Sequence, residues 1–133
     1  NSMSNEFRGE GNLGVQPTLR KVLVDGEPRS VAELRIFFDR FKGDGQGNYV
    51  PNGGFWLTGS IWDKRAEACV EHLQRGARVH AIGELVQETW SDKETGAERS
   101  EFKLNLDAVY PSLIKIEEVR FKPKREVPPA AST

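Results

Sequence analysis

Apolar side chains recur at every second position in several stretches of this sequence, and no other property limits the possible folds as strongly. The alternation is clear over residues 31–38, 55–62 and 102–107. A period of two residues is typical of a β-strand with one face buried and the other exposed. Asp25 and Gly26 separate the first of these strands from a preceding apolar run and predict a hairpin turn. The sequence therefore predicts a protein built mainly of antiparallel strands.

One helix is expected among these strands, over residues 63–76. Its apolar residues recur at helical spacing and form a single stripe: Ala66, Cys69, Val70 and Leu73. Asp63 is expected as the N-cap, and Gly76 just past the end of the helix. Cys69 lies on the stripe and is interpreted as a small core residue.

The remaining segments connect or extend the strands. Residues 39–54 contain five glycines and predict a flexible loop or an extended hairpin tip. Residues 78–90 and 101–109 predict a second long hairpin that turns around Gly96. Residues 114–124 have a composition compatible with one further short strand.

This order of elements predicts an all-β protein with an OB fold, a small Greek-key barrel with one helix between strands three and four. A split antiparallel sheet with one helix packed across it is the alternative. The 133 residues suffice for one hydrophobic core. We expect the domain to span residues 1–119, followed by a tail, residues 120–133, that is basic at first and then flexible.

The composition excludes several classes of protein. No apolar run approaches the roughly 20 residues of a membrane span, and the polar N-terminal segment is unlike a signal peptide. A single cysteine rules out an internal disulfide framework. With 19 Lys and Arg against 20 Asp and Glu, the net charge of -1 provides no overall basic field. We expect a cytoplasmic protein in which any site for an anionic partner is local.

Patterns typical of catalysis or metal binding are not found in the sequence. The glycines of residues 43–47 lack the strand-to-helix context of a phosphate-binding loop. Cys69, His72 and His80 do not have the spacing of metal ligands. We therefore expect a protein that is not an enzyme and that uses no metal and no cofactor.

The segment FWLTGSIW, residues 55–62, contains two of the three tryptophans. Strand alternation places Trp56, Thr58, Ser60 and Trp62 on one face and an ordinary core face on the other. Half-buried strands usually turn polar residues to water, so a pair of tryptophans there indicates a surface that is covered or binds a ligand. Because large aromatic residues also fill cores and subunit interfaces, that alternative remains open.

Neighbouring segments carry further aromatic and basic residues. They are Arg35, Phe37, Phe41, Lys42, Tyr49 and Trp90. Bases stack on flat rings, and guanidinium and ammonium groups contact phosphates. This combination favours a site for an unpaired nucleic acid strand.

Several motifs occur in an order that resembles a known family. They are GNLG at 11–14, QPTLR at 16–20, VAELRI at 31–36, the stretch IWDKRAEACVEHLQRGARVHAIGELVQETW at 61–90, and FKLNLDAV at 102–109. Together they make the chain similar to the bacterial single-stranded DNA-binding protein family, whose members have an OB fold. The resemblance implies base-stacking roles for Trp56, Trp62 and Trp90. It places Phe41, beside Lys42, near the position of another stacking tryptophan, and it places Arg20 and Arg35 along the DNA path.

The chain departs from this family in three respects. Leu57 replaces a histidine that belongs to subunit contacts, and the loop within residues 42–54 lacks the usual charged hairpin pattern. The family's acidic C-terminal tip is absent, and RFKPKREVPPAAST at 120–133 is basic and short. These departures suggest a divergent member from a plasmid or an integrated mobile element, or a truncated chain. We expect a homo-oligomer, a dimer or a tetramer, and no recruitment of partner proteins through an acidic tail.

The sequence thus predicts a nucleoid-associated protein that binds and coats single-stranded DNA without sequence preference, in replication, repair, recombination or mobile-element transfer. One alternative is a primosomal-type OB-fold accessory protein that acts mainly through protein contacts. Another is an OB-like module whose aromatic face binds a protein partner.

Overall fold

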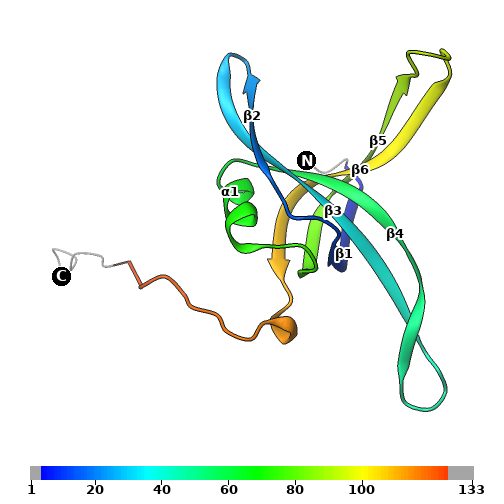
Figure 1. Ribbon diagram of the computed structural model, residues 1–133, viewed down its shortest axis with the longest axis vertical. Coiled ribbons are helices and arrows are strands. Elements are labelled where there is room, and N and C mark those ends of the chain that lie inside the picture. The colour runs from blue at the N-terminus through cyan, green and yellow to red at the C-terminus, as the bar shows by residue number, and fades with distance from the viewer. Residues whose placement is uncertain (1–3, 126–133) are drawn as a thin grey trace.

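The computed structural model describes residues 4–125. Its elements, in chain order, are β1 (Glu6–Leu13), β2 (Leu19–Val24), β3 (Glu27–Gly43), β4 (Tyr49–Trp62), α1 (Asp63–His72), β5 (Arg78–Ser91), β6 (Glu98–Pro111) and the short 3-10 helix η1 (Leu113–Lys115). Figure 1 shows α1 packed at one end of a strongly curved sheet. Among residues 4–125, no helix is long and apolar enough to cross a membrane.

The strands form a closed barrel with the OB fold. They are hydrogen-bonded in the order β1-β5-β6-β4-β3-β2, and β1 also pairs with β3, which closes the sheet. All pairings are antiparallel except that of β4 with β6. Gly11 permits the closure, because a Cβ atom there would collide with the backbone of Phe37. The expected OB fold is confirmed, and closure excludes the alternative of an open split sheet.

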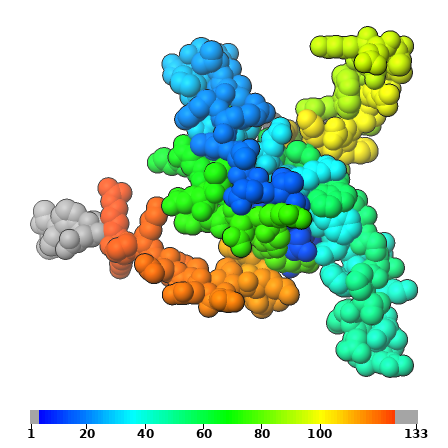
Figure 2. Space-filling view, in the orientation of Figure 1, coloured from blue at the N-terminus to red at the C-terminus, as the bar shows by residue number. Residues whose placement is uncertain are grey.

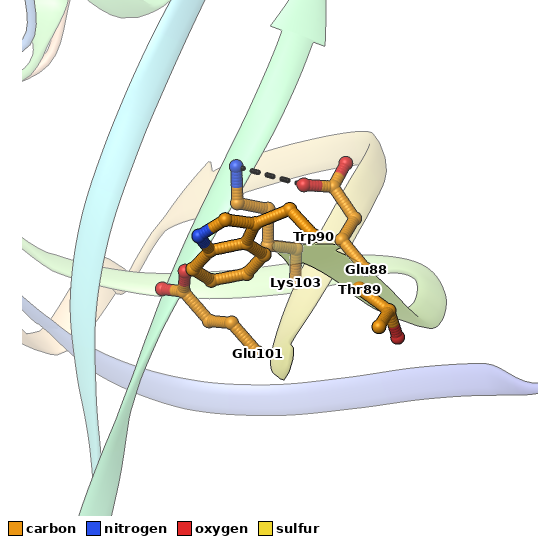
Figure 3. A pocket seen from close by; sticks show the side chains of 5 residues that line it. All are labelled: Glu88, Thr89, Trp90, Glu101 and Lys103. Atoms are coloured by element: carbon orange, nitrogen blue, oxygen red, sulfur yellow. Dashed lines mark ion pairs between the residues drawn. The ribbon is translucent and has the colours of Figure 1, made fainter. Parts of the chain in front are cut away.

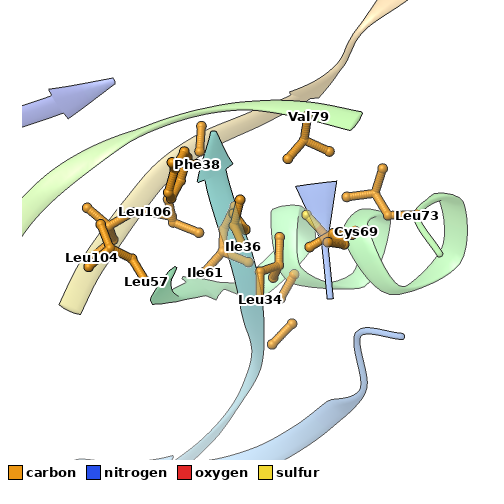
Figure 4. Close-up of a cluster of buried hydrophobic side chains, with 14 residues drawn as sticks. Leu34, Ile36, Phe38, Leu57, Ile61, Cys69, Leu73, Val79, Leu104 and Leu106 are labelled. Atoms are coloured by element: carbon orange, nitrogen blue, oxygen red, sulfur yellow. The ribbon is translucent and has the colours of Figure 1, made fainter. Parts of the chain in front are cut away.

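The core lies where the alternation places it. Ala32, Leu34, Ile36 and Phe38 point inward from β3 and are almost fully buried. Figure 4 shows this cluster extending from the strands to Cys69 on α1 and to Leu73 just after the helix. Ala66 of α1 belongs to the same cluster. Burial raises the pKa of the Cys69 thiol, as expected for a residue that serves in packing.

Three local predictions differ from the structure. Residues Glu6–Leu13 form an additional strand, so α1 follows the fourth strand of the chain; the glycines and charges of this segment obscure its alternation. Helix α1 ends at His72, and Asp63 makes no capping hydrogen bond because its carboxylate is paired with Arg29. In place of a further strand, residues 112–125 contain only η1, and residues 116–125 form neither helix nor strand.

Residues 39–54 form an extended hairpin tip and not a loose loop. The β3–β4 ladder continues to the pair Gly43 and Tyr49, with a bulge between Asp39 and Phe41. This hairpin, the β5–β6 hairpin and the β2–β3 hairpin project from the barrel in Figure 2. The predicted flexible tail lies mostly outside the described residues, since 126–133 are not among them.

Candidate nucleic-acid interface

The candidate site is the outer face of the barrel, which we define as the side of β3, β4 and β6 that points away from the core. Strand register brings its residues together. Arg35 lies opposite Thr58, and Phe37 lies opposite Trp56. The parallel pairing of β4 with β6 places Lys103 opposite Thr58. Residues far apart in the sequence therefore form one continuous surface.

Trp56 is held from several sides and is still 47% exposed. Its ring centroid is 5.2 Å from that of Phe37, and the Arg35 guanidinium lies 5.3 Å from the ring centroid. Arg35 donates a 3.0 Å hydrogen bond to the hydroxyl of Thr58. The hydroxyl of Thr58 thus orients the arginine that stacks on the Trp56 ring. A Cβ added to Gly14 would lie 2.6 Å from the Trp56 ring, so this glycine gives the ring its space.

Trp62 lies further along β4 and is partly buried. The Arg29 guanidinium covers its ring at 4.8 Å. Arg29 also donates two hydrogen bonds to Asp63, of 2.7 Å and 3.1 Å, and these hold the pKa of the Asp63 carboxyl below its ordinary value. Arg20, on β2, lies nearby and pairs with Glu33 at 3.4 Å. One face of the Trp62 ring is therefore occupied by a cation.

Trp90 lies on the β5–β6 hairpin and is also 47% exposed. Figure 3 shows its ring beside the side chains of Lys103 and Glu101, in a hollow that Glu88 and Thr89 also line. Lys103 pairs with Glu88 at 3.2 Å. Trp90 is thus surrounded by both signs of charge, and Lys103 connects it to the Thr58 region of the outer face.

Phe41, Lys42 and Tyr49 lie apart from this surface. They are on the distal part of the β3–β4 hairpin, beyond the bulge. Tyr49 is 78% exposed, and Phe41 lines a separate groove that includes Asp39. The structure brings Arg35, Phe37 and Trp56 together but leaves these three residues on a projecting arm.

Sequence reasoning missed three residues that shape the site: Gly14, Arg29 and Lys103. Gly14 was part of a motif, but its contact with Trp56 depends on a loop that returns to the barrel. Arg29 stands two residues before Val31, on the same strand face as Arg35, and alternation extended backwards from Arg35 identifies it. The position of Lys103 depends on the pairing of β4 with β6, for which no local pattern exists.

The residues of this face are suited to binding. Among residues 4–125, no group of three or more His, Cys, Asp or Glu side chains could hold a metal ion. A closed barrel whose outer face carries half-exposed rings interleaved with arginine and lysine defines an OB-fold binding module.

Comparison with known proteins places this module in a family. The model of the single-strand binding protein family matches residues 5–112. Single-stranded DNA-binding protein 2 of Streptomyces coelicolor is 36% identical over 104 residues, which are 77% of this chain and 50% of that protein. The chain belongs to the single-strand binding protein family.

Other comparisons agree with this assignment. The single-stranded DNA-binding protein of Bifidobacterium longum is 31% identical over 104 residues, covering 77% of this chain and 46% of that protein. The chain thus spans about half the length of the curated relatives it matches first. A crystal structure of the small single-stranded DNA-binding protein from Streptomyces coelicolor superimposes with a TM-score of 0.70 at 16% identity, covering 84% of this chain and 96% of that one. This likeness supports the fold.

Proposed function

We propose that this protein binds and coats single-stranded DNA without sequence preference. The observation that carries the proposal is the cluster of Trp56, Phe37 and Arg35, in which a half-exposed ring lies beside a guanidinium held by Thr58. Stacking uses the flat face that every base has, so it is tolerant of sequence. The family membership supports the same ligand.

The strand register suggests a path for the bound strand. From Trp90 it passes Lys103, crosses to Thr58 and Arg35, and reaches Trp56. Each stacked base contributes about 1–3 kcal/mol on the alanine-substitution scale, so a few rings suffice even though the net charge provides no attraction. Trp62 extends this path on β4, and Arg20 offers a further phosphate contact.

The cellular role proposed here is protection of single strands in replication, repair, recombination or mobile-element transfer, at the nucleoid. We assign binding to residues 1–119, and propose a homodimer or homotetramer as the working form. Sedimentation with and without a dT oligomer measures that assembly.

Titration with a dT oligomer while tryptophan fluorescence is recorded tests the proposal. We expect strong quenching at low salt, because bases that stack on Trp56 and Trp90 quench their emission. The midpoint should move to higher oligomer concentration as salt rises. A dT oligomer and a mixed-sequence oligomer of the same length should bind alike. Absence of quenching at low salt would contradict the proposal and favour a protein-binding accessory role.

A further inference from the structure

The basic residues around the three tryptophans are mostly ion-paired already. Four pairs are formed: Arg29 with Asp63 at 2.7 Å, Lys103 with Glu88 at 3.2 Å, Arg20 with Glu33 at 3.4 Å, and Arg99 with Asp92 at 3.4 Å. We call Glu33, Asp63, Glu88 and Asp92 the four paired carboxylates. All of them are at least partly exposed, so DNA that follows the proposed path can approach them.

Arg35 differs from these four cations. Within residues 4–125 it forms no ion pair, and its guanidinium is held by a neutral hydroxyl beside Trp56. Among the described residues, Arg35 is therefore a cation without an ion-pair partner beside the aromatic rings of the outer face, whereas the four cations around it are ion-paired. A phosphate that approaches the surrounding cations meets a carboxylate at each of them.

Two of the four paired carboxylates, Asp63 and Asp92, are stabilised in their charged form by neighbouring donors. Hydrogen bonds from Arg29 lower the pKa of Asp63. The backbone N–H groups of Thr95 and Glu94 lower the pKa of Asp92. Both carboxylates are therefore stabilised as anions beside the arginines with which they pair.

This arrangement affects single-stranded and duplex DNA differently. A single strand gains binding energy from stacking, which does not depend on the carboxylates. The bases of a duplex are already stacked on one another, so sequence-independent binding of a duplex relies on phosphate contacts. A duplex also carries about twice the charge per unit length of one strand, so it is repelled more strongly.

We propose that the four paired carboxylates are specificity-determining residues that exclude duplex DNA from the outer face. They do so by holding Arg20, Arg29, Arg99 and Lys103 in ion pairs that a phosphate must displace. The inference rests on the proposed function, because selection between the two forms of DNA matters only if the face binds a single strand.

The test compares the chain with its variant E33Q/D63N/E88Q/D92N. Fluorescence anisotropy measures the binding of a labelled dT oligomer and of a labelled hairpin duplex at several salt concentrations. We expect duplex affinity to rise about tenfold or more and dT affinity less than about threefold, with a steeper salt dependence for the duplex. The amides keep the size and acceptor oxygen of the carboxylates, and a thermal melt checks that the fold persists.

A control variant separates local charge from overall charge. E6Q/E71Q/E117Q/E118Q removes the same number of carboxylates from exposed positions outside the outer face. We expect its ratio of dT to duplex affinity to match that of the unmodified chain. An equal loss of selectivity in the control would overturn the inference, because overall charge would then explain it.

The two proposals fail in different ways. If the unmodified chain does not bind dT, the proposed function fails. If it binds dT and the fourfold variant keeps the same ratio of affinities, only the role of the carboxylates is refuted. The double variant E33Q/E88Q involves neither a turn nor a helix start, and it must shift the ratio in the same direction even if the fourfold variant unfolds.

Discussion

Trp56 and Trp90 are equally exposed, at 47% each, but they belong to different surroundings. Trp56 is on the barrel wall, where Phe37, Arg35 and Gly14 fix its ring. Trp90 is on a hairpin that projects from the barrel, beside Lys103 and Glu101. Equal exposure therefore does not imply equal roles: the first ring is preorganised by the fold, and the second depends on the position of a hairpin arm.

The charges near the two rings differ as well. Residues 86–103 contain five acidic and three basic side chains, a net charge of -2. The cation nearest Trp56 is Arg35, which has a hydroxyl as its hydrogen-bond partner. We infer that Trp56 contributes more than Trp90 to affinity. The β5–β6 hairpin that carries Trp90 contributes more than the barrel wall to selection among ligands.

The largest expected effect is a difference in the loss of stability between a substitution in the barrel wall and one in the β5–β6 hairpin. Ile36→Ala removes a fully buried side chain from β3, next to Phe37, and should lower the free energy of unfolding by about 2–5 kcal/mol. Phe102→Ala on the β5–β6 hairpin removes a ring that is 53% exposed and should cost less than about 1 kcal/mol. Urea denaturation followed by circular dichroism measures both. Similar losses for the two variants would contradict the distinction between wall and arm.

The next effect concerns DNA affinity. Trp56→Ala should weaken dT binding by about 1–3 kcal/mol, since it removes a preorganised stacking ring. Trp90→Ala should weaken binding by an amount at or below the lower end of that range, because the ring must first be ordered with its arm. Anisotropy titration with a labelled dT oligomer checks both, and thermal melts identify any loss of fold. A larger loss for Trp90→Ala would reverse the comparison.

The smallest effect tests whether packing preorganises Trp56. In Gly14→Ala, the new Cβ would lie 2.6 Å from the ring as it stands, so the ring must move. We expect dT affinity to fall about threefold to tenfold, which is part of the full stacking contribution, together with a shift in tryptophan emission. Gly43→Ala is the matched control, because a Cβ there meets nothing within 4 Å. Unchanged affinity in Gly14→Ala would mean that the position of the ring is not limiting.

Much of the fold was predictable because its signals are local. The inward residues of β3 and the stripe of α1 follow from periodicity, which depends only on neighbouring positions. The same rule failed for Phe102, which alternates with Leu104 as a core residue would but lies on the part of the hairpin beyond the barrel. Periodicity identifies the face of a strand, but it does not tell where along the strand the barrel ends.

The sequence by itself determined which side chains share a strand face, and hence that Trp56 and Trp62 lie on the outer side of β4 with Thr58 and Ser60 between them. Only the tertiary structure decided which residues surround them. The parallel pairing that brings Lys103 to Thr58, the contact of Gly14 with Trp56, and the ion pair of Arg29 with Asp63 all join segments separated along the chain. Such contacts depend on how the barrel closes, and closure follows from the burial of the whole core and not from any local pattern.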